Sequence, residues 1–166
     1  GIEWAIENHL DAVNMSLGSA QGSRAEEEVC KAALRAGVII LAAAGNESRG
    51  YSYPAAYPGV IAVAAVDSNN RHADFSNISD ATGISAPGVH IWSSIPGNQY
   101  TELSGTSMAT PHLTGVTALA KSLQRTLTPD EFQRVLYSSA QVLGNNEPEQ
   151  KEKYGDLNIV LYSYAL

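Results

Sequence analysis

The chain has 166 residues, of which 44% are hydrophobic and 16% charged, a balance typical of a globular domain with a large apolar interior. Seventeen acidic residues against ten basic ones give a net charge of −7. This charge repels nucleic-acid phosphates, and no cluster of Lys or Arg reverses it locally. The longest apolar stretches, residues 38–44 and 60–66, fall far short of the roughly 20 residues that span a bilayer. We therefore expect neither nucleic acid nor a membrane as a partner.

The first third of the chain alternates helical and strand-like patterns. Residues 1–10 carry apolar side chains at helical spacing, and residues 12–17 are patterned as a short strand. Ser23 and Glu26 have the spacing of a capping box, so a helix is expected to begin there and to end at Gly37.

Two apolar segments follow, and each is typical of a buried strand. Residues 38–44 are continuously apolar and begin with β-branched side chains, as in a strand covered on both faces, and residues 59–67 repeat this pattern. Helices and strands that alternate with short connections predict an α/β fold with three layers (α/β/α) and a mainly parallel central sheet. We expect the sheet to continue in residues that this chain does not contain.

The rest of the chain offers weaker signals, except at two helix starts. We expect a loop over residues 67–83, followed by short strands and turns over residues 83–100. A helix is expected from about Ser107, and a second capping box at Thr128 and Glu131 predicts another helix. A polar loop over residues 144–156 then leads to a last apolar segment over residues 157–166. No repeat or long linker divides the chain.

The stretch GTSMATPH, residues 105–112, places Ser107 where the long helix is expected to begin. A serine at this position is most often a helix cap, because its oxygen accepts a hydrogen bond from an unpaired helix amide. The alternative is a nucleophile. Gly105 leaves room for a substrate backbone, and a helix N-terminus directs N–H groups and a positive dipole end to the place where an oxyanion would form.

Several segments, in order, resemble those of the subtilisin-like serine proteases. GTSMATPH resembles the nucleophile segment of that family, AAAGNE at residues 42–47 resembles its oxyanion-hole segment, and VNMSLG at residues 13–18 resembles its substrate-binding strand. Further matches are YPAAYPGVIAVAAVD at residues 53–67, ISAPG at residues 84–88 and YGDLNIV at residues 154–160. The resemblance covers nearly the whole chain.

The resemblance implies roles for individual residues. Ser107 would attack the scissile carbonyl and become acylated, and Asn46 would be the side-chain donor of the oxyanion hole, together with the N–H of Ser107. A primary specificity pocket would have one wall formed by Ser16, Leu17 and Gly18 and the opposite wall by Ala43, Ala44 and Gly45. Such small side chains suit a sizeable apolar substrate residue. The plainer alternatives are a turn residue for Asn46 and tight packing of strand ends for the pocket walls.

A serine nucleophile also needs a base that a carboxylate orients, and the family has them in the order Asp, His, Ser. Asp11 followed by His72 or His90 satisfies this order only superficially. The family's aspartate lies in an Asp-Thr/Ser-Gly turn and its histidine in a His-Gly-Thr-His helix start, and neither pattern surrounds these residues. His112 is expected to pack along its own helix. Residues 1–166 are therefore expected to be the C-terminal part of a single subtilisin-like peptidase domain, whose Asp- and His-bearing N-terminal part is not in this chain.

The expected function is that of a serine endopeptidase acting on polypeptide substrates, once joined to the upstream part of its own catalytic domain. The chain alone is expected to be inactive. A pseudoenzyme or peptide-binding module that lost the base is the alternative. An α/β-hydrolase is disfavoured, because Ala109 replaces the last glycine of that fold's Gly-x-Ser-x-Gly elbow.

Three further expectations concern cofactors, compartment and cysteine chemistry. The resemblance implies no cofactor for the chemistry and places structural calcium in the missing N-terminal part. It favours a secreted protein, with a cytoplasmic one as the alternative. Cys30 is the single cysteine, so no internal disulfide can form, and its apolar neighbours predict a small core residue.

Overall fold

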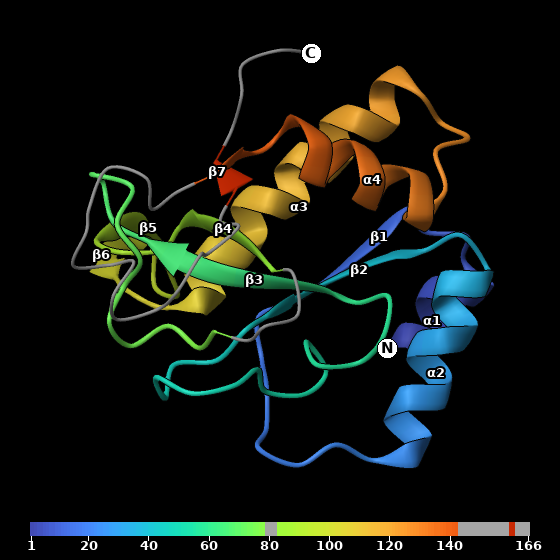
Figure 1. The fold of residues 1–166 in the computed structure, drawn as a ribbon, viewed down its shortest axis with the longest axis horizontal. Coiled ribbons are helices and arrows are strands. Elements are labelled where there is room, and N and C mark those ends of the chain that lie inside the picture. Colours follow the sequence, from blue (N-terminus) through green and yellow to red (C-terminus); the bar gives the residue numbers. More distant parts are fainter. Residues whose placement is uncertain (79–82, 143–159, 162–166) are drawn as a thin grey trace.

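The computed structural model describes residues 1–78, 83–142 and 160–161 (Figure 1). Its helices are α1 (Ile2–Glu7), α2 (Arg24–Arg35), α3 (Thr106–Leu123) and α4 (Pro129–Ser139). Its strands are β1 (Ala12–Met15), β2 (Ile39–Ala43), β3 (Ile61–Val66), β4 (Ile84–Pro87), β5 (Ile91–Ile95), β6 (Gln99–Leu103), β7 (Gln141–Val142) and β8 (Val160–Leu161). The polar loop expected over residues 144–156, and most of the last apolar segment, lie outside the described residues.

The strands β1 to β4 form one parallel sheet in the order β1-β2-β3-β4. Figure 1 shows α1 and α2 beside one face of this sheet and α3 and α4 beside the other. Helix α3 contacts all four strands, and α2 packs against β2. The predicted three-layer α/β/α architecture is confirmed.

Strand β2 lies at the centre of two cores, which explains its unbroken apolar sequence. Its five residues are all buried. Ile39 and Leu41 belong to the core formed with apolar side chains of α3 and α4, whereas Ile40 and Ala42 belong to the core that includes Cys30 of α2. Successive side chains of a strand point to opposite faces, so an apolar run is needed where helices cover both. Cys30 is a core residue as expected, and burial, followed by the charge of Glu26, raises the pKa of its thiol to about 11.

Two helix starts were predicted as capping boxes, and only one is complete. At α4, Glu131 N–H donates to Thr128 Oγ1 at 3.3 Å and Thr128 N–H donates to Glu131 Oε2 at 2.9 Å. At α2, Ser23 Oγ accepts from Glu26 N–H at 3.1 Å, but the reciprocal bond is replaced. The Ser23 N–H donates to the Tyr57 hydroxyl at 2.7 Å, and that hydroxyl lies 2.9 Å from Glu26 Oε2. The capping box predicted at Ser23 and Glu26 is therefore half correct, because the hydroxyl of the distant Tyr57 takes the place of the Glu26 carboxylate.

The N-terminal helix is shorter than its periodicity predicts. Helix α1 ends at Glu7 rather than near residue 10, since Asn8 caps it and His9 has a positive φ of 52°. The segment after β4 forms the antiparallel hairpin β5–β6, which leads directly to α3. This hairpin matches the short strands and turns expected there and extends them to Leu103.

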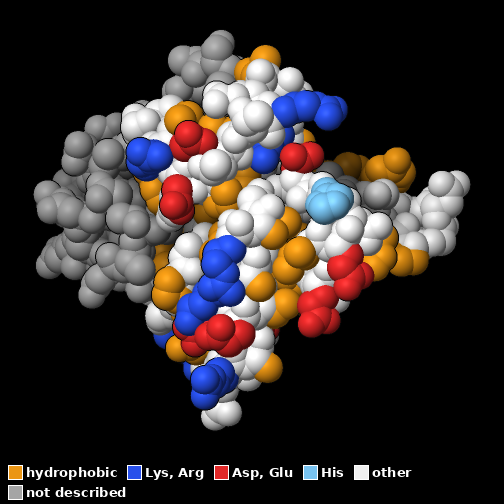
Figure 2. Space-filling view, turned by 90° about the vertical axis from the view of Figure 1, so that its right-hand side faces the viewer, with side chains coloured by type: hydrophobic (Ala, Val, Ile, Leu, Met, Phe, Trp, Pro, Cys, Tyr) orange, Lys and Arg blue, Asp and Glu red, His pale blue; other side chains and the backbone are white. Residues whose placement is uncertain are grey.

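The outer face of α1 and α2 is mixed in charge. Lys31 lies 2.8 Å from Glu27 and 3.4 Å from Glu28 along α2. Figure 2 shows basic and acidic side chains interspersed on this side of the molecule, without a gathered basic patch. No helix within the described ranges is both long and apolar enough to cross a membrane.

Candidate active site

Three segments far apart in the sequence meet at the carboxyl edge of the sheet. Because β1 and β2 are parallel, the residues that follow them lie at the same edge, which is where ligands bind in α/β folds. The N-terminus of α3 reaches the same place. Ser16 Oγ, just after β1, donates to the Ser107 carbonyl at 2.8 Å.

Ser107 is not the cap of α3. The helix begins at Thr106, and its N-cap is Gly105, with no side-chain capping bond. Ser107 is half-buried, and its Oγ donates to the Ser16 carbonyl at 3.3 Å instead of accepting from a helix amide. The capping interpretation is therefore wrong, and the hydroxyl lies at the junction of α3 with the end of β1.

Asn46 is anchored to the first residue of the same helix. Its Oδ1 accepts hydrogen bonds from the Thr106 N–H at 2.9 Å and from Thr106 Oγ1 at 3.0 Å. Because only the oxygen can accept these bonds, the Nδ2 donor occupies the other side of the amide. A Cβ built on Gly105 would lie 3.6 Å from that Nδ2. The Ser107 N–H belongs to the first turn of α3, where backbone donors have no intrahelical acceptor.

Thr106 was missed by the sequence analysis. Its side chain is fully buried, and besides donating to Asn46 its Oγ1 accepts from the Gly45 N–H at 3.2 Å. One side chain thus connects the start of α3 to the loop after β2. The signal in the sequence was a polar residue beside Ser107, which by itself does not distinguish a buried anchor from a solvated one.

The two predicted pocket walls meet at Ser52, which the sequence analysis also missed. A Cβ on Gly18 would lie 3.1 Å from Ser52 Cβ, and one on Gly45, where φ is +107°, would collide with Ser52 Oγ and with Asn77 Nδ2. Ser19 and Tyr53 exchange backbone hydrogen bonds at 2.9 Å, which join the segments behind these walls. Ser52 is 4% exposed, so its buried side chain lies between the two glycines.

The remaining wall residues differ in burial. Ala43 and Ala44 are buried, and Ala44 donates its N–H to the Val63 carbonyl and accepts from the Ser52 N–H. Leu17 is 55% exposed. The alanines are thus packed within the fold, whereas Leu17 presents an apolar surface to solvent.

The rejected candidates for the base and its carboxylate have partners elsewhere. Asp11 Oδ1 lies 3.6 Å from Lys121 Nζ, and His90 Nδ1 lies 2.7 Å from Glu102 Oε1. The other two candidate histidines face backbone carbonyls. His72 Nε2 lies 3.0 Å from that of Ser76, and His112 Nδ1 lies 2.9 Å from that of Met108. His112 is bonded along its own helix, as expected. In the part of the chain that the structure describes, no histidine is hydrogen-bonded to Ser107.

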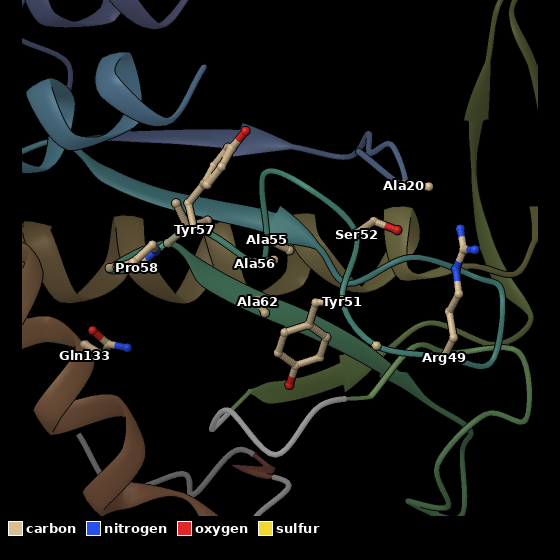
Figure 3. A pocket seen from close by; sticks show the side chains of 13 residues that line it. Ala20, Arg49, Tyr51, Ser52, Ala55, Ala56, Tyr57, Pro58, Ala62 and Gln133 are labelled. Atoms are coloured by element: carbon tan, nitrogen blue, oxygen red, sulfur yellow. The ribbon is translucent and has the colours of Figure 1, made fainter. Parts of the chain in front are cut away.

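A separate hollow of about 630 Å³ lies between residues 49–60 and Gln133 of α4. Figure 3 shows the rings of Tyr51 and Tyr57, two of the residues that line the hollow, pointing in opposite directions. The Tyr53–Pro54 peptide bond near it is cis. Neither Ser107 nor Asn46 lines this hollow, although Ser52 does. Across the described ranges, no group of three or more His, Cys, Asp or Glu side chains is placed to hold a metal ion.

Comparison with known proteins identifies the family to which this chain belongs. The model of the subtilase family matches residues 1–156. The chain belongs to the subtilase family. A thermostable alkaline protease from Halalkalibacterium halodurans is 49% identical over 146 residues, which are 87% of this chain and 40% of that protein. Subtilisin DY from Bacillus licheniformis is 45% identical over 151 residues, which are 88% of this chain and 55% of that protein.

Solved structures of proteases share the fold. A prenylagaramide maturation protease superposes with a TM-score of 0.85 at 32% identity, covering 96% of this chain and 62% of that one. A cold-adapted subtilisin-like serine proteinase superposes with a TM-score of 0.84 at 32% identity, covering 98% of this chain and 60% of that one. The chain thus spans 40 to 55% of the length of the two curated relatives named above.

Proposed function

We propose that this chain supplies the nucleophile, the oxyanion hole and the specificity pocket of a subtilisin-like serine endopeptidase. The observation that carries the proposal is the shared anchoring of two side chains at the N-terminus of α3. Ser107 Oγ is bonded to the end of β1, and Asn46 is bonded to Thr106, the residue before Ser107. Membership of the subtilase family supports the same roles.

In the proposed reaction, Ser107 Oγ attacks the scissile carbonyl carbon while an upstream histidine accepts its proton. The carbonyl oxygen then carries the negative charge of the tetrahedral intermediate. The Ser107 N–H and Asn46 Nδ2 donate to that oxygen, and the positive end of the α3 dipole adds to their effect. The histidine returns the proton to the leaving amine, which departs and leaves an acyl group on Ser107. Water then hydrolyses this ester and regenerates the hydroxyl.

The proposed substrate is an extended polypeptide. Its backbone would lie along the edge formed by Ser16, Leu17 and Gly18, adding a strand through main-chain hydrogen bonds. The side chain before the scissile bond would enter the slot between this edge and residues 43–45. The small side chains on both walls suit an apolar side chain there, and Ser52, between the two glycines, would form the base of the slot.

The proposal also includes the rest of the domain. Residues 1–166 form the C-terminal part of a single peptidase domain, and the upstream part contributes the aspartate, the histidine and structural calcium. Within the described strands β1 pairs only with β2, so its second edge is available for strands of that upstream part. The chemistry itself requires no cofactor. We place the enzyme outside the cell, as the resemblance to the subtilisin-like proteases implies.

The test is active-site labelling of the chain joined to its upstream part. A fluorophosphonate probe should label the intact enzyme and peptide cleavage should follow, whereas Ser107→Ala should abolish both. Ser122→Ala is the matched control, because Ser122 lies at the far end of the same helix, where its Oγ donates to the Leu119 carbonyl. Labelling that survives Ser107→Ala refutes the assignment. A folded, unlabelled protein that still binds peptides would instead identify a binding module.

A further inference from the structure

We infer that Asn77, buried beneath the loop that carries Asn46, is a positioning residue for the oxyanion hole. The inference rests on the proposed function, since it assigns Asn77 an effect on catalysis that passes through Asn46. Asn77 lies in the segment between β3 and β4, and its side chain is 0% exposed. A fully buried amide is retained in a protein only where its donors and acceptors are paired.

The amide oxygen of Asn77 holds the backbone that follows Asn46. Its Oδ1 accepts from the Glu47 N–H at 2.8 Å and from the Arg49 N–H at 3.1 Å. The backbone N–H of Asn77 also donates to the Gly45 carbonyl at 2.9 Å. Backbone N–H groups can pair only with an acceptor, so these contacts fix which end of the amide is the oxygen.

The amide nitrogen of Asn77 faces three acceptors. Its Nδ2 lies 2.8 Å from Glu47 Oε2, 3.1 Å from the Ala44 carbonyl and 3.3 Å from Ser52 Oγ. Glycine at position 45 makes this approach possible, because a Cβ there would collide with Nδ2. The side chain of Asn77 therefore spans the loop from the residue after β2 to Arg49.

These contacts converge on Asn46 without touching its side chain. Glu47 Oε2, which Asn77 holds, accepts from the Asn46 N–H at 3.1 Å. Asn77 thus fixes the backbone of Asn46 from one side, while Thr106 fixes its side-chain oxygen from the other. An oxyanion donor acts only when it is already aimed at the developing charge, and a misplacement of about 1 Å costs on the order of 10²-fold in rate.

Aspartate is the informative substitution at this position. It has nearly the same shape as asparagine and keeps the Oδ1 acceptor, but it replaces the donor that faces the Ala44 carbonyl with an oxygen. It also brings a second carboxyl group against that of Glu47. The loop should shift to relieve these contacts and carry Asn46 with it, so Asn77→Asp should lower kcat by about tenfold to a hundredfold with little change in KM.

A double-mutant cycle in the full-length protease separates positioning from folding. Asn46→Leu removes the donor, and the loss measured for removing such a donor in a related subtilisin is roughly 10²–10³ in kcat. If Asn77 acts through Asn46, Asn77→Asp should lower kcat by less than about twofold in the Asn46→Leu background. Its effect on the melting temperature should be the same in both backgrounds.

Ser76→Ala is the matched control. Ser76 is the neighbouring buried polar residue. Its Oγ accepts from the Ala65 N–H of β3 at 3.0 Å and donates to the backbone carbonyl of Asn77 at 3.4 Å, so its bonds do not reach the loop of Asn46. This variant should lower the melting temperature and leave kcat within about twofold of the parent. If Asn77→Asp does not fold, Asn77→Ser, which is smaller and polar, carries the same predictions.

Each outcome has a distinct meaning. A folded Asn77 variant with unchanged kcat, or one whose kcat loss is equal in both backgrounds, overturns the inference. An Asn46→Leu variant that keeps its kcat refutes the oxyanion role in the proposed function instead. A kcat loss that disappears when Asn46 is absent supports the inference.

Discussion

The Thr106 N–H and the Thr106 hydroxyl both donate to Oδ1 of Asn46, at 2.9 and 3.0 Å. This pair of bonds determines which way the Asn46 amide faces, because both require its oxygen. The Gly45 N–H completes the arrangement by donating to Thr106 Oγ1 at 3.2 Å. The loop after β2 and the start of α3 are thus joined through one buried hydroxyl group.

Thr106→Val tests this joint, because valine has nearly the same shape and lacks the hydroxyl. The variant should lose one of the two bonds to Asn46 and leave the Gly45 N–H unpaired, which costs about 1–3 kcal/mol of stability. In the full-length enzyme we expect kcat to fall about tenfold, with a smaller change in KM. Steady-state kinetics and thermal unfolding measure both effects. Thr106→Ser, which keeps the hydroxyl, is the control, and equal kinetics for the two variants would contradict the assigned role.

Gly45→Ala tests whether the loop needs space as well as backbone freedom. Gly45 and Gly97 both have positive φ, at +107° and +86°, but an added Cβ meets atoms of Asn77 and Ser52 at the first and nothing within 4 Å at the second. Gly97→Ala should therefore lower the free energy of unfolding only through its strained backbone, by about 1–2 kcal/mol. Gly45→Ala should lower the free energy of unfolding clearly more and should also lower the activity. Denaturant unfolding of the two variants gives the comparison, and equal losses would show that the collision is relieved without cost.

Tyr57→Phe tests the tyrosine that completes the start of α2. Removing the hydroxyl leaves the Ser23 N–H without its 2.7 Å acceptor, which should cost about 1 kcal/mol of stability. Tyr53→Phe is the control, because it keeps the ring pair with Tyr57, whose centroids are 4.9 Å apart. Thermal unfolding of both variants should show a lower melting temperature for Tyr57→Phe alone.

The pKa of Tyr57 leads to a prediction about how stability depends on pH. Burial, followed by the hydrogen bond to Glu26, raises the pKa of Tyr57 above its usual value of 10.0. A group whose pKa is raised on folding stabilises the protein while it is protonated and loses that contribution as the pH rises through the folded-state pKa. The difference in melting temperature between the parent and Tyr57→Phe should therefore be constant from pH 6 to about pH 9 and shrink above about pH 10. A difference that grows with pH would contradict this assignment.

Local sequence was enough to predict the layered fold, because periodicity and burial are local properties. The run at residues 38–44 predicted a strand covered on both faces, and β2 is fully buried between two helical layers. The apolar run did not determine which of its side chains face which helical layer. That depends on the helices packed against each face, namely α3 and α4 for Ile39 and Leu41, and α2 for Ile40 and Ala42.

The candidate site divides in the same way. Ser107 and Asn46 each lie in a short contiguous motif, so the sequence by itself determined them as candidates. Thr106 lies in the motif of Ser107, but its role depends on Asn46, 60 residues away along the chain. Ser52 and Asn77 lie outside the motifs of Ser107 and Asn46. Ser52 contacts Asn77, 25 residues away, and Asn77 contacts partners 25 to 33 residues away. Likewise Ser23 and Glu26 predicted a capping box, but Tyr57, 34 residues from Ser23, supplied half of it. A hydrogen bond between distant segments is decided by tertiary packing, since only packing brings its donor and acceptor within reach of each other.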